Sequence, residues 1–340
     1  MSKQIRWGIL STAKIGRTAV IPAIQQSERG QVIAIASRDE SRAAEVAAEL
    51  NIPKAYGSYD ALLADEEIDA VYIPMPNHLH MEWTIRAARA GKHVLCEKPA
   101  ALNEKQVSQM IEVCREENVV FAEAFMYRYH PKHRRVKEII ESGEIGEVRA
   151  IHANFTYNNC EDKDNVRFQK NMGGGSLYDV GVYPISAARM FLETEPEAVT
   201  VHALFSPEHD DVDMMASGLI EFPNKVALTF DCGMWACARA EFEILGTKGR
   251  IELPKVFGWE NSDIPPQIII HTDHVTREER VSVSNSFVLQ AEAIADAILD
   301  GKPLPFAPED AVNNIRVIEA CLESAHKRER VQLTSKVPVF

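Results

Sequence analysis

Short apolar runs alternate with amphipathic stretches over the first 125 residues of the chain. The apolar runs resemble strands of a parallel sheet that is covered on both faces. Helical stretches between such strands are typical of βαβ units. The expected strands are Ile5–Leu10, Val32–Ala36, Ile68–Ile73, His93–Cys96 and Val119–Ala124, and the expected helices are Ile15–Gln26, Glu40–Leu50, His80–Ala90 and Glu104–Glu117.

The pattern changes after Tyr127, where strand-like segments follow one another. Turn-forming residues such as Pro223-Asn224-Lys225 separate some of them, which predicts a large, mostly antiparallel sheet. Two further helices are expected near the end, over Phe287–Leu299 and Pro308–Lys327. The expected strands are Val148–Tyr157, Ala198–Phe205, Ala216–Phe222, Val226–Cys232, Ala240–Leu245, Arg250–Leu253, Gln267–His271 and Arg280–Val283.

This change of pattern predicts two α/β domains, over residues 1–125 and 126–340, and a length of 340 residues agrees with two cores. The first domain has a parallel sheet, and the second has an open, mostly antiparallel one. We expect the final helices, 287–327, to pack near the first domain. One face of the second sheet would leave an apolar surface if unpaired, so we expect a homodimer or higher homo-oligomer joined through it, with Val226–Phe230 and Ala240–Leu245 as contributors.

The composition excludes several classes of protein. Fifty acidic residues against 37 basic ones give a net charge of −13, which opposes binding to nucleic acid or to anionic membranes. No apolar run approaches the roughly 18–20 residues of a membrane helix, and the chain enters a strand-like run at once, without a signal peptide. The six cysteines form no C-x-x-C pair. We therefore expect a cytoplasmic protein with reduced thiols and no metal site.

The turn after the first strand is a candidate phosphate-binding site. A pyrophosphate needs a tight strand-to-helix turn with free backbone amides at the helix N-terminus. The spacing of a G-x-G-x-x-G fingerprint falls on Ser11, Ala13 and Gly16, of which only the last is glycine. An ordinary turn of small residues is the alternative. The residues expected to bind the cofactor here are Ser11, Thr12, Ala13, Lys14 and Ile15.

The end of the second strand reads Ser37-Arg38-Asp39. Sites that select NAD place a carboxylate there for the ribose 2′-hydroxyl. Ser37 stands at that position, and the guanidinium of Arg38 suits a 2′-phosphate. The prediction is therefore NADP, with NAD still possible. The alternative is a solvated Arg38 beside an Asp39 that only caps the next helix.

Two later loops lie at the carboxyl edge of the predicted sheet, where open α/β sheets bind ligands. In the first loop, Pro74, Asn77 and His80 are expected near the cofactor, although Asn77 could instead cap the next helix. The histidines of this loop are expected to shape it rather than to catalyse. In the second loop, Glu97 and Lys98 end a strand, and a following proline restrains the lysine.

Taken in order, these motifs resemble the glucose–fructose oxidoreductase / inositol dehydrogenase (Gfo/Idh/MocA) family over essentially the whole chain. The most specific parts are Glu97-Lys98-Pro99 and the glycine-rich run from Gly173 to Tyr183. The resemblance also includes the turn Gly8–Gly16, the segment Pro76–His80 and the later turn Leu245–Gly249.

The resemblance implies a Rossmann domain, a second domain that often dimerises through its sheet, and NAD(P)-dependent oxidation or reduction of sugars, cyclitols or related diols. It implies that Lys98 and Asp179 are catalytic. Inositol dehydrogenases have a histidine where this chain has Tyr183, so the chain is most similar to the branch of dihydrodiol and NADP-xylose dehydrogenases. In that branch the tyrosine is the acid/base, which makes inositol an unexpected substrate.

The chemistry of the residues agrees with these roles. Asp179 and Tyr183 are spaced i, i+4, which places them on one helix face, although Pro184 removes a helical N–H. A tyrosine titrates near pH 10 in water, and a neighbouring Lys98 would lower that pKa. The alternative is that Asp179 only caps a helix and that Tyr183 only packs between domains.

Two questions stay open at the level of the sequence. Arg128, where the two domains join, could contact the nicotinamide or substrate, or it could form an ion pair. The leading function is an enzyme that interconverts a hydroxyl and a carbonyl of a sugar, polyol or diol. The alternative is a dinucleotide- or sugar-sensing regulator without turnover, because a fold does not fix a function.

Overall fold

The computed structural model describes residues 3–257 and 267–333. Its contacts divide the chain into two compact units. Unit 1 combines Met1–Tyr129 with Asn285–Val312, and unit 2 combines His130–Ser284 with Asn313–Phe340.

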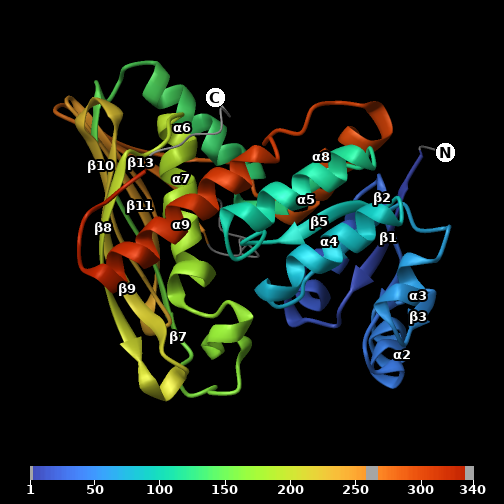
Figure 1. Cartoon of the computed structure of the whole chain (residues 1–340). Coiled ribbons are helices and arrows are strands. Elements are labelled where there is room, and N and C mark those ends of the chain that lie inside the picture. Colours follow the sequence, from blue (N-terminus) through green and yellow to red (C-terminus); the bar gives the residue numbers. More distant parts are fainter. Residues whose placement is uncertain (1–2, 258–266, 334–340) are drawn as a thin grey trace. The chain divides into compact units, whose positions relative to one another are not determined.

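Unit 1 is built on a six-stranded parallel sheet with the strand order β3-β2-β1-β4-β5-β6 (Figure 1). This is the order of a Rossmann fold, as the alternation of strands and helices predicts. The strands are β1 (Ile5–Leu10), β2 (Gly30–Ala36), β3 (Lys54–Tyr56), β4 (Ala70–Ile73), β5 (His93–Glu97) and β6 (Phe121–Ala124).

The helices of unit 1 begin at side chains that cap them. Asp39, Ser58 and Asn103 each accept hydrogen bonds from backbone N–H groups in the first turn of the helix that follows. The helices are α1 (Ile21–Gln26, after a π-helical turn Gly16–Val20), α2 (Glu40–Glu49), α3 (Tyr59–Leu63), α4 (His80–Arg89), α5 (Glu104–Glu116) and α8 (Ser286–Asp300).

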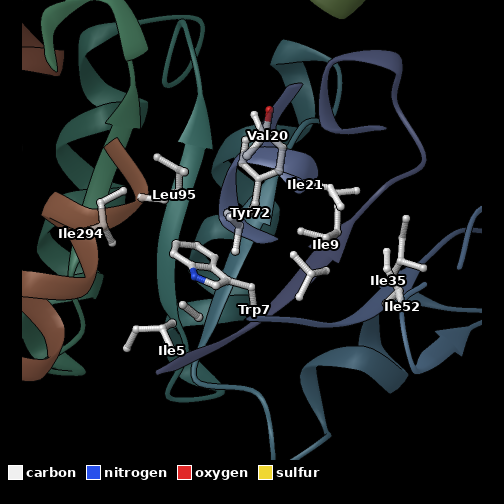
Figure 2. Packing of buried hydrophobic residues seen from close by; sticks show 14 of the residues in the cluster. Ile5, Trp7, Ile9, Val20, Ile21, Ile35, Ile52, Tyr72, Leu95 and Ile294 are labelled. Carbon is white, nitrogen blue, oxygen red and sulfur yellow. The ribbon is translucent and has the colours of Figure 1, made fainter. Parts of the chain in front are cut away.

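The core of unit 1 includes residues from both parts of its sequence. Trp7 of β1 has no exposed surface and packs in the same cluster as Leu95 of β5 and Ile294 of α8 (Figure 2). Arg29 forms ion pairs with Asp296 and Asp300 of α8. The late helix α8 therefore belongs to the parallel-sheet unit, although more than 150 residues of unit 2 precede it.

Unit 2 is built on a nine-stranded sheet with the order β14-β13-β12-β11-β7-β10-β9-β8-β15. Only β7 and β10 pair in parallel, so the sheet is mostly antiparallel as predicted. The strands are β7 (Val148–Asn158), β8 (Ala198–Ser206), β9 (Val212–Phe222), β10 (Val226–Gly233), β11 (Trp235–Gly246), β12 (Gly249–Leu253), β13 (Gln267–Thr272), β14 (Thr276–Arg280) and β15 (Val331–Gln332).

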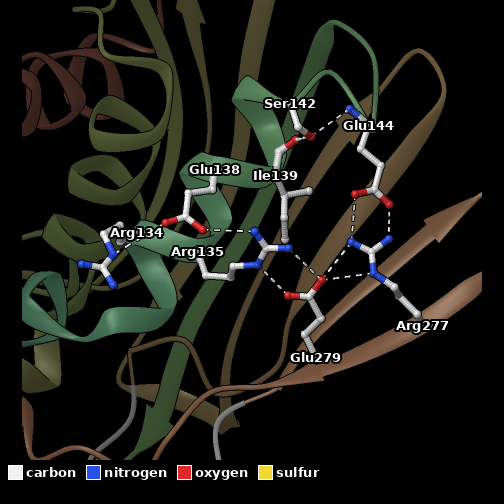
Figure 3. A network of polar contacts seen from close by, with 8 residues as sticks. All are labelled: Arg134, Arg135, Glu138, Ile139, Ser142, Glu144, Arg277 and Glu279. Atoms are coloured by element: carbon white, nitrogen blue, oxygen red, sulfur yellow. Dashed lines mark hydrogen bonds and ion pairs between the residues drawn. The ribbon is translucent and has the colours of Figure 1, made fainter.

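Helices pack on one face of this sheet, and they are α6 (Pro131–Glu141), α7 (Val182–Leu192) and α9 (Glu309–Lys327), the last of which begins in unit 1 (Figure 1). A network of ion pairs ties α6 to β14 (Figure 3). Arg135 of α6 bonds Glu279 at 2.7 Å, and Glu279 also bonds Arg277 at 2.9 Å. Arg277 in turn pairs with Glu144, which follows α6.

The open face of the nine-stranded sheet is mixed: polar side chains lie beside the exposed Leu204 and Leu219, so the face is not the broad apolar surface that the sequence predicts. Along β10, Leu228 and Phe230 are buried, whereas Thr229 and Asp231 are exposed. Glu241 is exposed in the same way on β11. The apolar residues of these strands therefore face the helices, because strand side chains alternate between faces.

Several elements differ from the predicted ones. The short β3 and α3 and the helix α6 are not in the predicted set. β3 and α3 are too short to show a period, and in α6 the few apolar residues, such as Val136 and Ile139, stand among many charged ones. The strand expected over Arg280–Val283 is instead Thr276–Arg280, which pairs with β13 to form a hairpin.

Candidate active site

The first βα turn has the backbone of a phosphate-binding fingerprint without its first glycine. Ser11 adopts a φ of 144°, in the region that favours glycine. Its hydroxyl oxygen accepts a hydrogen bond from the Ala13 amide at 3.1 Å. Strained backbone of this kind clusters at active sites and ligand-binding turns. The turn leads directly into the helical segment that starts near Lys14, and the N-terminus of a helix after a first βα turn is where Rossmann folds hold a pyrophosphate.

At the end of β2, Asp39 turns toward the next helix. Its Oδ1 accepts hydrogen bonds from the Ser41 and Arg42 amides, at 2.9 and 3.2 Å, and from the Ser41 hydroxyl. These bonds, chiefly the one from the Ser41 hydroxyl, lower the pKa of Asp39. Asp39 is thus the N-cap of α2. Of the two residues before it, Ser37 is partly buried and Arg38 is exposed. The carboxylate that would repel a 2′-phosphate is therefore held by α2.

The His80 side chain is fully buried and holds two loops together. Its ring has no exposed surface, and its two nitrogens lie 2.9 Å from the Pro99 carbonyl oxygen and 2.7 Å from that of Met75. This corrects the expectation that His80 contacts the cofactor. The short helical turn Asn77–Leu79 is preceded by Pro76 in the cap position. Asn77 therefore lies inside the turn and is not a helix cap. Pro74 is buried beside this turn.

Carboxylates of the sheet fix the segment that carries Lys98. Glu97 accepts a hydrogen bond from the Tyr72 hydroxyl at 2.6 Å and another from the Lys98 amide at 3.3 Å. Glu123 accepts one from the Ala100 amide at 2.8 Å. The backbone on both sides of Lys98 is therefore anchored at the carboxyl edge of the sheet, as the Glu-Lys-Pro motif predicts.

Arg128 is buried and forms an ion pair. Its Nη1 lies 2.5 Å from Asp310 Oδ2, and its guanidinium lies over the rings of Phe125 and Phe306 at 4.4 and 5.2 Å. Only 4% of its side chain is exposed. Of the two roles left open for Arg128, the structure shows the ion pair.

In unit 2, the glycine-rich run closes tightly around a buried carboxylate. Gly175 adopts a φ of 118°, and a Cβ there would lie 2.1 Å from Asp213 Oδ1. Asp213 Oδ2 accepts hydrogen bonds from the Ser176 hydroxyl at 2.7 Å and the Leu177 amide at 2.8 Å. Glycine is therefore required at position 175, and Asp213 anchors the start of the next helix.

That helix begins as a π-helical turn, Leu177–Gly181, which carries Asp179, and continues as α7, which carries Tyr183. The Val182 amide bonds the Leu177 carbonyl five residues back, and Pro184 follows without an N–H. π-helical turns occur frequently at functional sites. The two residues thus lie one turn apart on a continuous helical segment, as their spacing predicts.

Asp179 is held through both carboxylate oxygens. Oδ2 accepts a hydrogen bond from the Tyr157 hydroxyl at 2.5 Å, and Oδ1 accepts one from Arg167 Nε at 2.9 Å. Burial, and then the Asp179 charge, raise the pKa of Tyr157, and Asp179 is the chief cause that raises the pKa of Arg167. Asp179 is therefore not a helix cap but the centre of a polar cluster.

The Tyr183 ring packs against aromatic side chains. Its centroid lies 5.1 Å from that of Phe155, at a steep interplanar angle of 70°, and 5.6 Å from that of Phe257. Phe155 and Phe257 stack on each other at 5.5 Å. Phe155 and Tyr157 are two residues apart on β7 and so share a face. One strand thus supports Tyr183 and donates to Asp179.

The sequence analysis did not identify Tyr157, Arg167 or Asp213 as part of this site. The alternation along β7 could have placed Tyr157 on the helix-covered face, because Ile151 and Ala153 are buried on it. No sequence pattern marks Arg167 or Asp213. Both lie against the glycine-rich run, which is a tertiary contact.

Within residues 3–257 and 267–333, no group of three or more histidine, cysteine, aspartate or glutamate side chains could hold a metal ion. The six cysteines are unpaired. None of the helices in these same ranges is both long and apolar enough to cross a membrane.

Comparison with protein-family models gives two matches. A model described as "Oxidoreductase family, NAD-binding Rossmann fold" matches residues 5–125, and one described as "GFO/IDH/MocA C-terminal domain" matches residues 133–252. Together they cover most of both units.

Individual proteins are similar over nearly the whole chain. An uncharacterized oxidoreductase of Rhizobium meliloti is 41% identical, over 95% of this chain and 97% of its own. A D-xylose 1-dehydrogenase (NADP(+)) of Haloferax volcanii is 38% identical, over 96% of this chain and 99% of its own. The crystal structure of a 3-ketoreductase from Actinomadura kijaniata, in complex with NADP and TDP-benzene, has a TM-score of 0.90 at 32% identity and covers 95% of this chain and 98% of that one.

Proposed function

The chain belongs to the GFO/IDH/MocA family of oxidoreductases, and from this premise we propose that it transfers hydride between NADP(H) and a carbon of a sugar, polyol or diol. The carbon alternates between a hydroxyl and a carbonyl state. The observation that carries the proposal is the ordered pair Asp179 and Tyr183 on one helical segment, with Asp179 held through both oxygens. A regulator without turnover would have no need of this arrangement.

The choice of NADP rests on the end of β2. Arg38 is exposed there, and the carboxylate of the adjacent Asp39 is bound to the first turn of α2. The turn Ser11–Ile15 fits a pyrophosphate because Ser11 has the backbone conformation of the missing glycine. We propose that Ser37, Pro74, Asn77, Glu97 and Lys98 complete the cofactor site. The D-xylose dehydrogenase and the 3-ketoreductase, both named above with NADP, support this choice.

When bound, the nicotinamide would supply or accept the hydride. Tyr183 would then move the proton, with its hydroxyl donating to the carbonyl oxygen in reduction and its phenolate accepting the hydroxyl proton in oxidation. The ammonium of Lys98 would stabilise the phenolate and polarise the carbonyl oxygen. Asp179 is an acceptor for a substrate hydroxyl or for the lysine. The proposal thus needs Lys98, Asp179 and Tyr183 together.

We also propose that the enzyme is a homodimer or higher homo-oligomer joined through the open face of the nine-stranded sheet. The basis is a polar face on which His152, Asp231 and Arg239 offer groups of both charge signs to a second copy. The exposed Leu204 and Leu219 add apolar surface. Light scattering at micromolar concentration tests this proposal, and a monomer would contradict it. The six unpaired cysteines lead us to propose the reducing cytoplasm as its compartment.

A substrate screen tests the function. The purified protein is incubated with NADP(H) or NAD(H) and with aldoses, polyols or trans-dihydrodiols, and the absorbance of the reduced nicotinamide is followed. We expect turnover with at least one of these classes and a preference for NADP(H). Tight binding of NADP without turnover of any substrate would favour the regulator instead.

A further inference from the structure

We propose that Tyr157 and Arg167 are positioning residues of this reaction, which together hold the Asp179 carboxylate in one orientation, and that Tyr157 is not the source of the transferred proton. The inference rests on the function proposed above. It adds two residues from separate elements of unit 2 to the trio of Lys98, Asp179 and Tyr183.

The contacts leave Asp179 little freedom. Its two oxygens accept from different donors, at 2.5 Å from the Tyr157 hydroxyl and 2.9 Å from Arg167 Nε. Only 13% of the Asp179 side chain is exposed. A carboxylate that keeps both hydrogen bonds cannot rotate, so its remaining lone pairs point in fixed directions. Such a group is suited to orient a substrate hydroxyl or an ammonium.

The glycine-rich run is shaped to bring Arg167 to Asp179. The Gly175 amide donates to the Arg167 carbonyl oxygen at 3.0 Å, and a Cβ on Gly174 would lie 2.5 Å from that same oxygen. Asn165 accepts from the Arg167 amide at 3.1 Å and so fixes the other side of the turn. The run therefore makes room for Arg167, in addition to its role at Asp213.

The charges decide which tyrosine carries the proton. Tyr157 is half-buried beside an anionic acceptor, and both the burial and the Asp179 charge raise its pKa and keep it a neutral donor. The Asp179 charge also raises the pKa of Arg167, which keeps its guanidinium cationic. A phenol that shares its proton with a carboxylate is a poor acid and a poor base near neutral pH. Tyr183, whose ring packs on Phe155 and Phe257, is then the tyrosine left for proton transfer.

The kinetic test compares two substitutions that each remove one hydroxyl. Tyr157→Phe should lower kcat roughly 10- to 100-fold, the worth of one hydrogen bond to a charged group. In Tyr157→Phe, the NADPH dissociation constant and the basic limb of the pH–rate profile should both stay as in wild type. Tyr183→Phe, by contrast, should abolish the basic limb. Arg167→Lys should recover part of the activity that Arg167→Met loses. The control is Tyr178→Phe, which removes the hydroxyl of a half-buried tyrosine next to Asp179 in sequence and should leave kcat unchanged.

A double-mutant cycle shows whether Tyr157 acts through Asp179. In an Asp179→Asn background, Tyr157→Phe should change kcat less than about twofold, because the acceptor is already lost. Equal effects of Tyr157→Phe in both backgrounds would overturn the proposal, and so would a loss of the basic limb in Tyr157→Phe alone.

A readout without turnover separates this inference from the proposed function. Chemical denaturation of the same four variants should give a coupling of about tenfold in the unfolding equilibrium constant between Tyr157 and Asp179. Absence of coupling would overturn the inference whatever the activity. Coupling in a protein that turns over no substrate would instead support the held carboxylate and contradict the enzyme.

Discussion

The Asp213 carboxylate accepts a hydrogen bond from the Ser176 hydroxyl at 2.7 Å, inside a fully buried part of unit 2. This contact fixes the start of the helical segment that carries Asp179 and Tyr183. Burial raises the pKa of Asp213 to about 6 from its ordinary value of 3.8, because the charged form loses its solvent. The structural support of the candidate site is therefore linked to pH.

The pH dependence of stability tests this link. A group whose pKa is raised in the fold stabilises the protein fully below its unfolded value, about 4, and loses that contribution as the pH rises through about 6. The difference corresponds to about 3 kcal/mol. Asp213→Asn cannot ionise, so its stability relative to wild type should increase between pH 4 and pH 7, as measured by chemical denaturation. If the free energies of unfolding of the two proteins changed in parallel with pH, the raised pKa of Asp213 would be contradicted.

Gly175 should tolerate no side chain. Alanine there would strain a φ of 118° and place its Cβ 2.1 Å from Asp213 Oδ1. We expect Gly175→Ala to destabilise unit 2 by about 3 kcal/mol or more and to lower kcat. Gly143 is the matched control, because its φ is 73° but no atom lies within 4 Å of its missing Cβ. Gly143→Ala should cost only about 1 kcal/mol, and equal losses in both variants would refute the steric argument.

Arg38→Ala should weaken NADP(H) binding about 10- to 100-fold, the worth of a hydrogen bond to a charged group, and should leave NAD(H) binding nearly unchanged. Fluorescence titration of the reduced cofactors measures both. Arg89→Ala removes an exposed arginine from α4 and controls for the loss of one positive charge. Equal affinity of the wild-type protein for the two cofactors would show that Arg38 does not select between them.

The ion-pair network around Glu279 should stabilise the protein in a salt-dependent way. Its hydrogen bonds, chiefly the one from Arg135, lower the pKa of Glu279 to about 2. Its contribution is therefore present above about pH 4.5 and is lost as the pH falls through about 2. Glu279→Gln should lower the free energy of unfolding by about 1 kcal/mol at low salt and by less at high salt. A loss that high salt leaves unchanged would argue against an electrostatic cause.

The sequence predicts the parts of this molecule that depend on local pattern. Apolar runs and helix caps locate the Rossmann strands, and the motifs around Lys98 and Asp179 locate the candidate chemistry. The open face of the sheet is more polar than predicted, because within Val226–Phe230 the apolar Leu228 and Phe230 are buried and Thr229 is exposed. The contacts of Asp179 could not be predicted, since Tyr157 and Arg167 lie 22 and 12 residues away in sequence and only the glycine turn brings them together.

The central claim is that Tyr183 transfers the proton, and the turnover of Tyr183→Phe tests it most directly. This substitution removes one hydroxyl and keeps the ring that packs on Phe155 and Phe257. Stopped-flow or steady-state rates with the substrate found in the screen should fall by roughly 10²–10⁴-fold, the usual worth of a positioned acid/base group, while NADPH binding and the melting temperature stay as in wild type. A turnover near that of wild type would contradict the account, because the proton would then have to come from another group.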